Sequence, residues 1–502
     1  MDSSKHIVLF GAGKSATGLI EYLKTLSAQN NWPVTIADNN LQAVQQKVGT
    51  HTHTKAVQVD IENDANRQAL VQQAALVISL MPPTLHFLVA KDCLLFGKHL
   101  LTASYTDANI QALAPAIKAK GILFLCEMGL DPGIDHMSAM QLLNGIRQKG
   151  GEITSFLSHC GGLVAPESDD NPWHYKISWN PRNVVLAGKA GATFTQNGQT
   201  VHIPYQKLFA HNPPVFVTGL EPLAYYPNRD SAGYAELYGI ASTDTFIRTT
   251  LRHPEFCFGW KNIVDLRLTD EEKVYETDGM SFAEFFRQHF EKNGFTTWLN
   301  DLLGSRLTYA KEMMEKLMEL MDAEEAAADD DDEDMGDQFM MVNEQGNLDV
   351  VDVEDVKDKA AETVASTMHE ANLSMKQLFF LGLDDETPIN KGLCSAADVL
   401  QCILEQKLAL KPHDKDMVVM MHEVEYLLNG HKKTVKSSLV VKGEDSVHTA
   451  MAKTVGLPLG IAARLILEGQ ITETGLHIPI LPNIYEPVLT ELRRHGIRFE
   501  EE

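Results

Sequence analysis

Residues 128–137, MGLDPGIDHM, carry more ionisable groups than a turn between a strand and a helix requires. They follow the apolar run GILFLCE, and such a turn needs only a glycine and one capping side chain. In the structural interpretation, Asp131 caps the next helix, Pro132 takes its first position, and Asp135 and His136 face water. The alternative is a functional site at the end of this strand.

A second pattern with chemical meaning lies at the start of the chain. VLFGAGKSATG predicts a strand, then Gly11-x-Gly13-x-x-Ala16, then a helix. Gly11 allows a tight turn, Gly13 lets the backbone approach a pyrophosphate, and Ala16 still permits close packing of helix and strand. The helix N-terminus adds amide donors and the positive end of its dipole. The pattern predicts a dinucleotide site, in which we include Lys14 and Ser15.

Acidic residues after the next two strands predict how the adenosine is held. Asp38 ends the second strand, where a carboxylate accepts hydrogen bonds from the ribose hydroxyls and repels a 2′-phosphate. We therefore expect NAD as the cofactor in preference to NADP. The alternative is that Asp38 is a turn residue before NNLQAV. Asp60 and Ile61 end the third strand, where we expect an adenine contact or, alternatively, an ordinary strand-end cap.

Alternating strands and helices must position these motifs. Over residues 7–130, apolar runs such as HIVLFGAG and ALVISLMPP alternate with helical patterns such as GLIEYLKTL. Runs rich in Val, Ile and Leu are typical of buried parallel strands. We expect an α/β fold with an N-terminal, Rossmann-type, doubly wound parallel sheet.

The later part of the chain predicts further domains. From about residue 151, short strands separated by turn residues predict an antiparallel arrangement, and helical patterns at 275–325 and 360–405 predict a helical insertion. The expected domains are residues 1–130 with a returning C-terminal helix at about 483–502, residues 131–275 with 405–482, and a helical domain at 276–404. Asn429-Gly430 predicts a hairpin turn, and Gly456 and Pro458 predict a break between two helices.

Composition limits the classes of function. The net charge is −25, with 44% hydrophobic and 22% charged residues, which favours a globular protein without nucleic-acid partners. The segment 322–337 holds ten acidic and no basic residues, so it predicts a disordered insert at about 322–360. Six widely spaced cysteines indicate a reducing cytoplasm and no metal site. We find no leader pattern and no apolar run of membrane-spanning length.

Several stretches outside the phosphate loop carry one resemblance. TASYTD, GLDPGIDHM, SHCGGLVAPESDDNPWHYKISWNPR, YYPNRDS and RTTLRH together resemble the saccharopine dehydrogenases of the glutamate-forming type, or saccharopine reductases. The resemblance implies a nicotinamide domain joined to a substrate and dimerisation domain of mixed α/β type, with a smaller helical domain inserted, and a homodimer. It also implies that saccharopine, NAD(P)+ and water give glutamate, 2-aminoadipate semialdehyde and NAD(P)H. Fungal members that use NADP lack an acid at the end of the second strand, so Asp38 favours NAD.

The resemblance implies catalytic roles for Tyr105, Asp131 and Cys160. Asp131 accepts a proton from the substrate amine or orients a water, and Tyr105 donates to a carboxylate or to the developing oxygen. A small packing residue is the alternative for Cys160, and an amphipathic tyrosine at a domain seam is the alternative for Tyr105.

The resemblance also implies how substrate and cofactor are bound. Saccharopine carries three carboxylates, which need cations in a negatively charged protein. Arg229 is our first candidate for this clamp and Arg252 the second, with surface ion pairs as the alternative for both. Ser104 and Tyr105 complete the expected substrate contacts. The remaining expected cofactor contacts are Ser79, Leu80, Met81, Leu130, Asp131 and Pro132.

Two other functions remain open from the sequence. A relative acting on another secondary amine, such as a carboxynorspermidine dehydrogenase, would need an acidic pocket for its polycationic substrate, whereas Arg229 favours carboxylates. A nucleotide-binding regulatory protein without catalysis would not need Tyr105, Asp131 and Arg229 together.

Overall fold

The computed structural model describes residues 5–298, 304–305, 308–309, 311–315, 318, 338–342 and 348–502. The chain divides into two compact units. The first comprises Met1–Lys261 and Leu404–Glu502, and the second comprises Asn262–Ile403. Both of the large sheets, and every residue that we predicted for the site, belong to the first unit.

The predicted parallel sheet is present. Within the described residues, seven strands form it in the order β20-β6-β5-β4-β1-β2-β3. The strands are β1 Ile7–Phe10, β2 Val34–Asp38, β3 Thr54–Gln58, β4 Leu76–Ser79, β5 His99–Thr102, β6 Leu123–Leu125 and β20 Gly475–His477. Strand β1 pairs with β2 on one side and with β4 on the other, so the strand order reverses there. Ligands bind at the carboxyl edge of such a reversal point.

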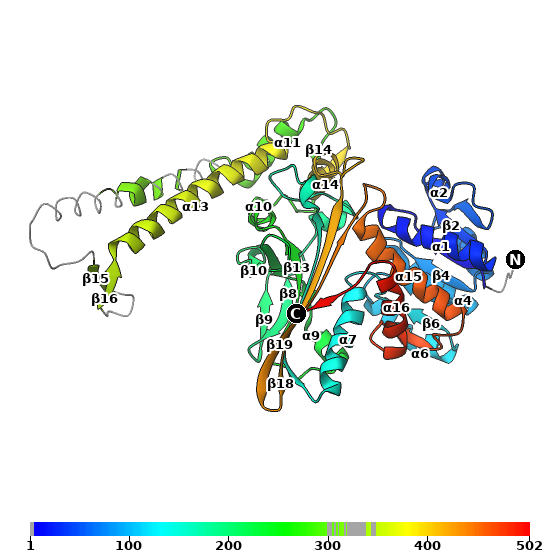
Figure 1. The fold of residues 1–502 in the computed structure, drawn as a ribbon. Helices are drawn as coiled ribbons and strands as arrows, with labels where there is room; N and C mark the ends of the chain where they lie inside the picture. Colours follow the sequence, from blue (N-terminus) through cyan, green and yellow to red (C-terminus); the bar gives the residue numbers. More distant parts are fainter. Residues whose placement is uncertain are drawn as a thin grey trace, which may run out of the picture. The chain divides into compact units, whose positions relative to one another are not determined.

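Both faces of this sheet are covered. In β1, Ile7 and Leu9 belong to one hydrophobic cluster, and Val8 and Phe10 belong to another. This arrangement confirms the doubly wound fold (Figure 1). The helices that follow the strands are α1 Thr17–Asn30, α2 Leu41–Val48, α3 Asp64–Gln73, α4 Pro83–Phe96, α5 Ala108–Ala112 and α6 Ala114–Ala119, with a 3-10 turn, η2, at Lys14–Ala16.

The second sheet is mixed. Its main path runs β10-β11-β13-β7-β18-β19-β21, with β8, β9 and β12 beside it. Strands β7 and β13 are parallel, whereas β18 is antiparallel to both β7 and β19. The strands are β7 Glu152–Val164, β8 Ala192–Gln196, β9 Gln199–Ile203, β10 Pro214–Val215, β11 Leu223–Pro227, β12 Arg229–Asp230, β13 Thr245–Arg252, β18 Asp416–Leu428, β19 His431–Lys442 and β21 Glu500–Glu501. The turn between β18 and β19 is Asn429-Gly430, as predicted, and both residues have positive φ.

Helices α7 Ile134–Gln148 and α9 Ala232–Leu237 pack against this sheet, and α8 Pro181–Val185 and α10 Pro254–Asp265 lie in its connections. These connections also contain the 3-10 turns η3 Pro166–Ser168 and η4 Tyr205–Lys207. Helix α7 begins directly after the MGLDPG segment, and its residues pack into the same hydrophobic cluster as β7 and β18.

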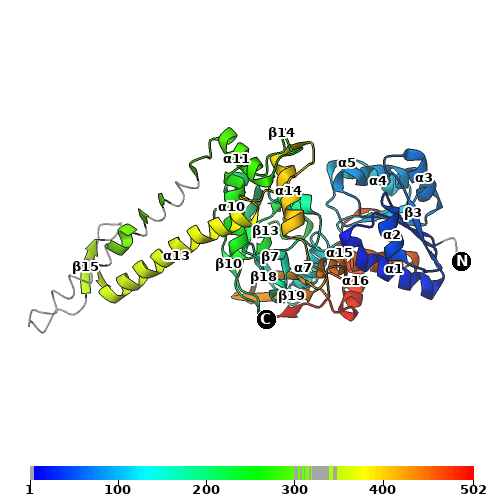
Figure 2. The same cartoon turned by 90° about the horizontal axis from the view of Figure 1, so that it is seen from above.

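The expected break at Gly456 and Pro458 is absent, because residues Ala450–Leu467 form one helix, α15. Figure 2 shows α15 beside α1. A Cβ atom on Gly456 would lie 2.5 Å from the backbone nitrogen of Leu19, so this close approach requires glycine. Among the described residues, α15 is the one helix whose length and composition would allow it to span a membrane, contrary to our expectation that no run is long enough. Most of α15 is buried, as in a core helix.

The C-terminal segment contacts both sheets. Helix α16 covers Pro482–Arg494, and its Glu491 accepts a hydrogen bond of 2.6 Å from the Tyr22 hydroxyl of α1. The expected helix at about 483–502 is shorter than predicted, because β21 pairs with β19 of the second sheet. Strand β20 extends the parallel sheet beside β6.

The second unit contains helices and short strand pairs. Its helices include α11 Phe282–Asn293 and α13 Val353–Phe380, and α14 Ala396–Lys407 leads back into the first unit. Strand β14 Lys273–Glu276 pairs with β17 Leu393–Ser395, and β15 Gln338–Val342 pairs with β16 Leu348–Asp352. This hairpin and the start of α13 lie inside the predicted disordered insert at 322–360, so regular structure occupies its later part. Residues 322–337 of that prediction lie outside the described residues.

Candidate active site

The phosphate loop has the geometry of a dinucleotide site. Gly11 has a φ of 99°, and a Cβ atom there would lie 2.7 Å from the carbonyl oxygen of Leu80. The loop can therefore cross the end of β4 only with glycine at this position. A Cβ on Gly13 would meet nothing within 4 Å, so the space beside it is open to a ligand. Lys14 is exposed and Ser15 half-buried at the start of η2, where they can reach a phosphate group.

Asp38 has backbone partners. Its two carboxylate oxygens accept hydrogen bonds from the amides of Ala12, at 2.8 Å, and Asn40, at 3.0 Å. The Lys47 ammonium donates to the carbonyl of Gly13 at 2.6 Å, and it lies close enough to Asp38 to interact with its charge. Asp38 therefore fixes the phosphate loop by hydrogen bonds to its backbone, and the Lys47 ammonium lies beside the carboxylate.

The other residues predicted to contact the cofactor lie at several strand ends. Strand β3 ends at Gln58, so Asp60 and Ile61 lie in the following turn, where Asp60 accepts a local hydrogen bond from the amide of Glu62. This contact fits the alternative of a cap. Ser79 ends β4 and is fully buried, and Leu80 and Met81 are half-buried after it. Leu130 and Pro132 are buried on either side of Asp131.

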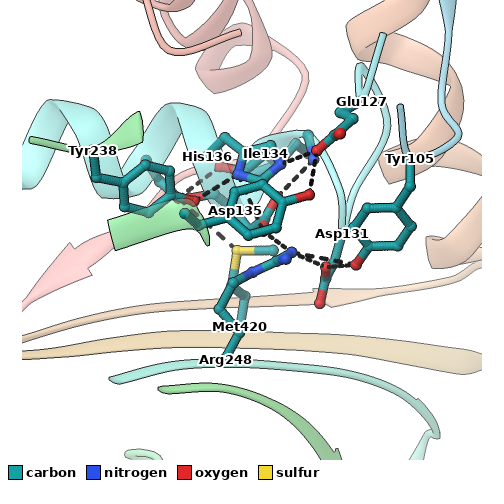
Figure 3. Close-up of polar contacts among 12 residues, drawn as sticks. Tyr105, Glu127, Asp131, Ile134, Asp135, His136, Tyr238, Arg248 and Met420 are labelled. Carbon is teal, nitrogen blue, oxygen red and sulfur yellow. Dashed lines mark hydrogen bonds and ion pairs between the residues drawn. The ribbon is translucent and has the colours of Figure 1, made fainter. Parts of the chain in front are cut away.

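Tyr105, Asp131 and Arg248 meet at the carboxyl edge of the parallel sheet. Tyr105 follows β5, Asp131 follows β6, and Arg248 extends from β13 (Figure 3). The Tyr105 hydroxyl donates to Asp131 Oδ1 at 3.0 Å, and an Arg248 nitrogen donates to the same oxygen at 2.6 Å. Among the described residues, Asp131 Oδ2 has no hydrogen-bond donor. The structure thus brings together two of the predicted catalytic residues and adds an arginine that we did not predict.

Asp135 and His136 do not face water, contrary to the structural interpretation of the turn. Both are buried in the first turn of α7. Asp135 accepts from Arg248 at 2.7 Å and from the amide of Gly133 at 2.6 Å. Gly133 occupies the N-cap position of α7, so Asp131 does not cap this helix as predicted. His136 hydrogen-bonds Glu127 at 2.9 Å and the Tyr238 hydroxyl at 2.6 Å. Because these hydrogen bonds replace those with water, both polar side chains can be buried.

The electrostatics of the two aspartates differ. Burial raises the pKa of Asp131; the charge of Arg248 opposes this rise and the charge of Asp135 adds to it. Burial alone would also raise the pKa of Asp135, but His136 and Arg248 bring it below its ordinary value. Burial raises the pKa of Tyr105, which keeps the phenol protonated as a donor. Asp131, whose side chain is 12% exposed, is therefore the more basic and the more accessible carboxylate.

The two predicted clamp arginines have different surroundings. Arg229 is exposed on β12, and its guanidinium lies 5.1 Å from the ring centre of Tyr105. Arg252 is 3% exposed and lies over the rings of Tyr175 and Phe256. It donates to the carbonyl of Leu251 at 2.7 Å, but its Nε is buried without a hydrogen-bond partner. Within the described residues Arg252 has no acidic partner, so the surface-pair alternative does not apply to it.

Cys160 is buried in the middle of the second sheet. It lies opposite Thr250 of β13 and Met420 of β18. Burial raises the pKa of its thiol well above the ordinary value, and the charges of Asp131 and Asp135 add to the rise. The thiol therefore stays protonated beside the cluster, which fits a packing role and makes a nucleophilic thiolate unfavourable.

Arg248, Glu127 and Tyr234 were missed by the sequence analysis. Arg248 lies four residues before Arg252 on β13, so both point to the same face of the strand. This spacing could have indicated Arg248 as a further candidate, because Arg252 was already expected at the site. The Arg248 guanidinium also lies 4.5 Å from the ring centre of Tyr234, which donates to Glu127 at 2.9 Å. No sequence pattern indicated these two partners.

The parallel sheet, its phosphate loop and the polar cluster at its carboxyl edge define a dinucleotide-binding protein with a second, mixed-sheet domain. Family comparison agrees with this architecture. Residues 7–125 match the saccharopine dehydrogenase NADP binding domain, and residues 129–497 match the saccharopine dehydrogenase C-terminal domain. The chain belongs to the saccharopine dehydrogenase family.

Individual relatives cover the whole chain. The Saccharomyces cerevisiae protein named saccharopine dehydrogenase [NADP(+), L-glutamate-forming] is 30% identical over 99% of each chain. A solved structure of the apo, L-Glu forming enzyme from the same organism is 28% identical, covers 99% of each chain and has a TM-score of 0.76. The mouse mitochondrial alpha-aminoadipic semialdehyde synthase is 30% identical over 99% of this chain and 48% of its own length. The chain thus spans about half the length of such relatives.

These comparisons correct one prediction. We expected NAD, with NADP less favoured, from the acid at Asp38. The matching family domain is described as NADP-binding, and fungal relatives are named for NADP(+). The prediction of NAD as the main cofactor is wrong. Its physical weakness is that the Asp38 carboxylate is already hydrogen-bonded to the loop backbone and has Lys47 beside it.

Proposed function

We propose that the chain oxidises saccharopine with NADP+ and water to L-glutamate, 2-aminoadipate 6-semialdehyde, NADPH and a proton, or runs the reverse reaction. The observation that carries this proposal is Arg252. Its guanidinium is buried and has no acidic partner in the described part of the chain. The charges of Arg252, Arg248 and Asp131 all act on the Cys160 thiol, so Arg252 lies near the cluster. A buried cation without a counter-ion is costly unless a ligand supplies the negative charge. A substrate with three carboxylates does so.

The dinucleotide site fits the proposed cofactor, which supplies a hydride acceptor when bound. Gly13 leaves space for the pyrophosphate, and the start of α1 gives amide donors. Lys47 supplies positive charge near Asp38, where a 2′-phosphate would need it, and Lys14 is exposed in the phosphate loop.

Asp131 and Tyr105 perform the proton chemistry in this proposal. The substrate nitrogen must lose its proton before the adjacent carbon can lose a hydride. Asp131 Oδ2 has no donor among the residues that the structure describes, so it can accept that proton. Tyr105 holds the other oxygen of Asp131, and Arg248 fixes both residues. Once this first proton has passed to solvent, the same carboxylate can take a proton from the water that adds to the imine.

Reduction of NADP+ with saccharopine, followed as absorbance at the wavelength of NADPH, tests the function directly. We expect turnover with saccharopine and none with carboxynorspermidine, whose positive charges would face Arg229 and Arg252. Absence of NADPH formation, together with absence of the reverse reaction from glutamate and the semialdehyde, would refute the proposal.

We predict that Lys47→Ala weakens NADP+ more than NAD+. The ammonium provides a charge-assisted contact of roughly 1.5–3 kcal/mol to a phosphate group, equivalent to about ten-fold or more in KM. Initial-rate kinetics with both cofactors measure this ratio. Lys24→Ala removes a lysine that contacts the same helix end through the carbonyl of Lys47, and it serves as the matched control. An equal rise of both KM values in Lys47→Ala would contradict a role at the 2′-phosphate.

We predict that Arg252→Met raises the KM for saccharopine by about ten- to a hundred-fold, because a charge-assisted pair of roughly 1.5–3 kcal/mol is lost. Methionine keeps the contacts with the rings of Tyr175 and Phe256. The KM for NADP+ stays within about two-fold. Arg229→Met is the comparison: its exposed guanidinium should contribute less. A larger rise in KM for the Arg229 variant than for the Arg252 variant would make Arg229 the main carboxylate clamp, as the sequence predicted.

One further proposal rests on cysteine composition, and another rests on the family resemblance. The six cysteines are all free and buried, which fits the expected cytoplasmic location. We also propose a homodimer, which light scattering on the purified chain would test.

A further inference from the structure

His86 connects the ends of two strands to the substrate side of the site. It lies in the first turn of α4 and is 5% exposed. Its Nδ1 faces the Ser79 hydroxyl at 2.8 Å and the Thr102 hydroxyl at 3.4 Å. Its Nε2 contacts the Ser104 hydroxyl at 2.6 Å. Both ring nitrogens therefore have partners, and the imidazole bridges β4, β5 and the residue before Tyr105.

The partners indicate which nitrogen carries the proton. Burial lowers the pKa of His86 to about 4, so near neutral pH the ring has one N–H donor and one lone pair. Two hydroxyl groups, each with a hydrogen to donate, face Nδ1. Nδ1 is therefore the acceptor and Nε2–H donates to Ser104. A serine oxygen that accepts from the ring keeps its own hydrogen free for another group.

We propose that His86 is a positioning residue that holds the Ser104 hydroxyl as a donor toward a substrate carboxylate. This inference rests on the proposed function, because Ser104 is one of the expected saccharopine contacts. Ser104 is half-buried and adjacent to Tyr105, and its carbonyl accepts from the amide of Glu127 at 3.1 Å. Its backbone is thus fixed, and its side chain can reach a ligand near the Tyr105–Asp131–Arg248 cluster. His86 is too deeply buried to touch that ligand itself.

Two amide substitutions at His86 distinguish the hydrogen bond of Nδ1 from that of Nε2. In His86→Gln the side-chain amide reaches the place of Nε2 and can still donate to Ser104. In His86→Asn it reaches only the place of Nδ1 and bonds Ser79. We expect His86→Asn to lower kcat/KM for saccharopine about ten-fold, as for one hydrogen bond to a charged group, and His86→Gln to keep most of it. The KM for NADP+ should change less than about two-fold in both variants.

A double-mutant cycle tests whether His86 acts through Ser104. Ser104→Ala should cost about as much as His86→Asn, and the double variant should cost no more than either, because the residues act as a unit. His99→Asn, at the opposite end of β5, is the control and should leave the kinetics unchanged.

Each outcome either supports or overturns the positioning role of His86. Additive losses, or equal losses in His86→Gln and His86→Asn, would show that His86 merely supports the fold, and the inference would be overturned. If the unmodified protein neither oxidises saccharopine nor runs the reverse reaction, the proposed function fails, and the role of Ser104 as a carboxylate donor fails with it. Retained activity with additive losses would overturn the inference alone.

Discussion

Replacing Asp131 by Asn should lower kcat for saccharopine oxidation by about 10²- to 10⁴-fold, the usual contribution of a general base. Asparagine has the same shape and can still accept from Tyr105 and Arg248 through its oxygen, but it cannot take a proton. Asp131 is also an expected cofactor contact, but asparagine keeps the size of the side chain, so the KM for NADP+ should change little. Stopped-flow and steady-state kinetics of NADPH formation measure both constants.

The pH profile gives a second measure of the same role. Protonated Asp131 cannot accept a proton, so the rate of the unmodified enzyme should fall as the pH drops through the pKa of Asp131. Burial raises that pKa, so the fall should begin above the ordinary range of an aspartate. The acidic limb should be missing in Asp131→Asn.

Asp135→Asn is the matched control, since it removes an equal charge from the same arginine. Asp135 is buried and accepts from Arg248 and from the amide of Gly133, so its replacement should affect stability and leave most of kcat. If both variants lose kcat equally, the charge balance of Arg248 explains the loss, and Asp131 is not the base.

Local rules predicted the parts of the site whose partners lie nearby in the sequence. Gly11 and Gly13 belong to a strand–turn–helix pattern that the sequence shows directly, although the close contact of Gly11 is with Leu80, and the turn at Asn429-Gly430 joins adjacent strands. Tyr105 and Asp131 were expected from the family resemblance, and both follow strands of the parallel sheet, whose carboxyl ends meet at one edge.

The same rules failed where the deciding partner is distant. Asp135 and His136 look like surface residues of a turn, but Arg248 and Tyr238, more than a hundred residues later, give them buried partners. Asp38 ends β2, where an acid is typical of NAD-binding proteins, but the positive charge of Lys47 lies close to it. Gly456 and Pro458 suggested a helix break because the sequence does not show that α1 packs closely against α15.

Removing the guanidinium of Arg248 should cause a large loss of stability. In Arg248→Met, Asp131 and Asp135 lose the cation that each contacts within 2.7 Å. Removing one partner of a buried ion pair costs about 3–5 kcal/mol, because the charge left behind is uncompensated. Urea unfolding followed by tryptophan fluorescence measures this difference. Lys432→Met breaks an exposed pair with Glu425 and should cost less than about 1 kcal/mol.

The pH dependence distinguishes lost charge compensation from lost packing. Arg248 lowers the pKa of both carboxyl groups, so each pKa in the folded variant lies above its value in the folded unmodified protein. The folded variant therefore binds more protons than the folded unmodified protein, and its stability relative to the unmodified protein should recover as the pH falls from about 7.5 to about 5. Adding Asp135→Asn to Arg248→Met removes one of the two uncompensated charges and should restore part of the loss near neutral pH. A deficit that is unchanged by both pH and the second substitution would mean that the Arg248 side chain stabilises this site by packing between Tyr105 and Tyr234, and not by its charge.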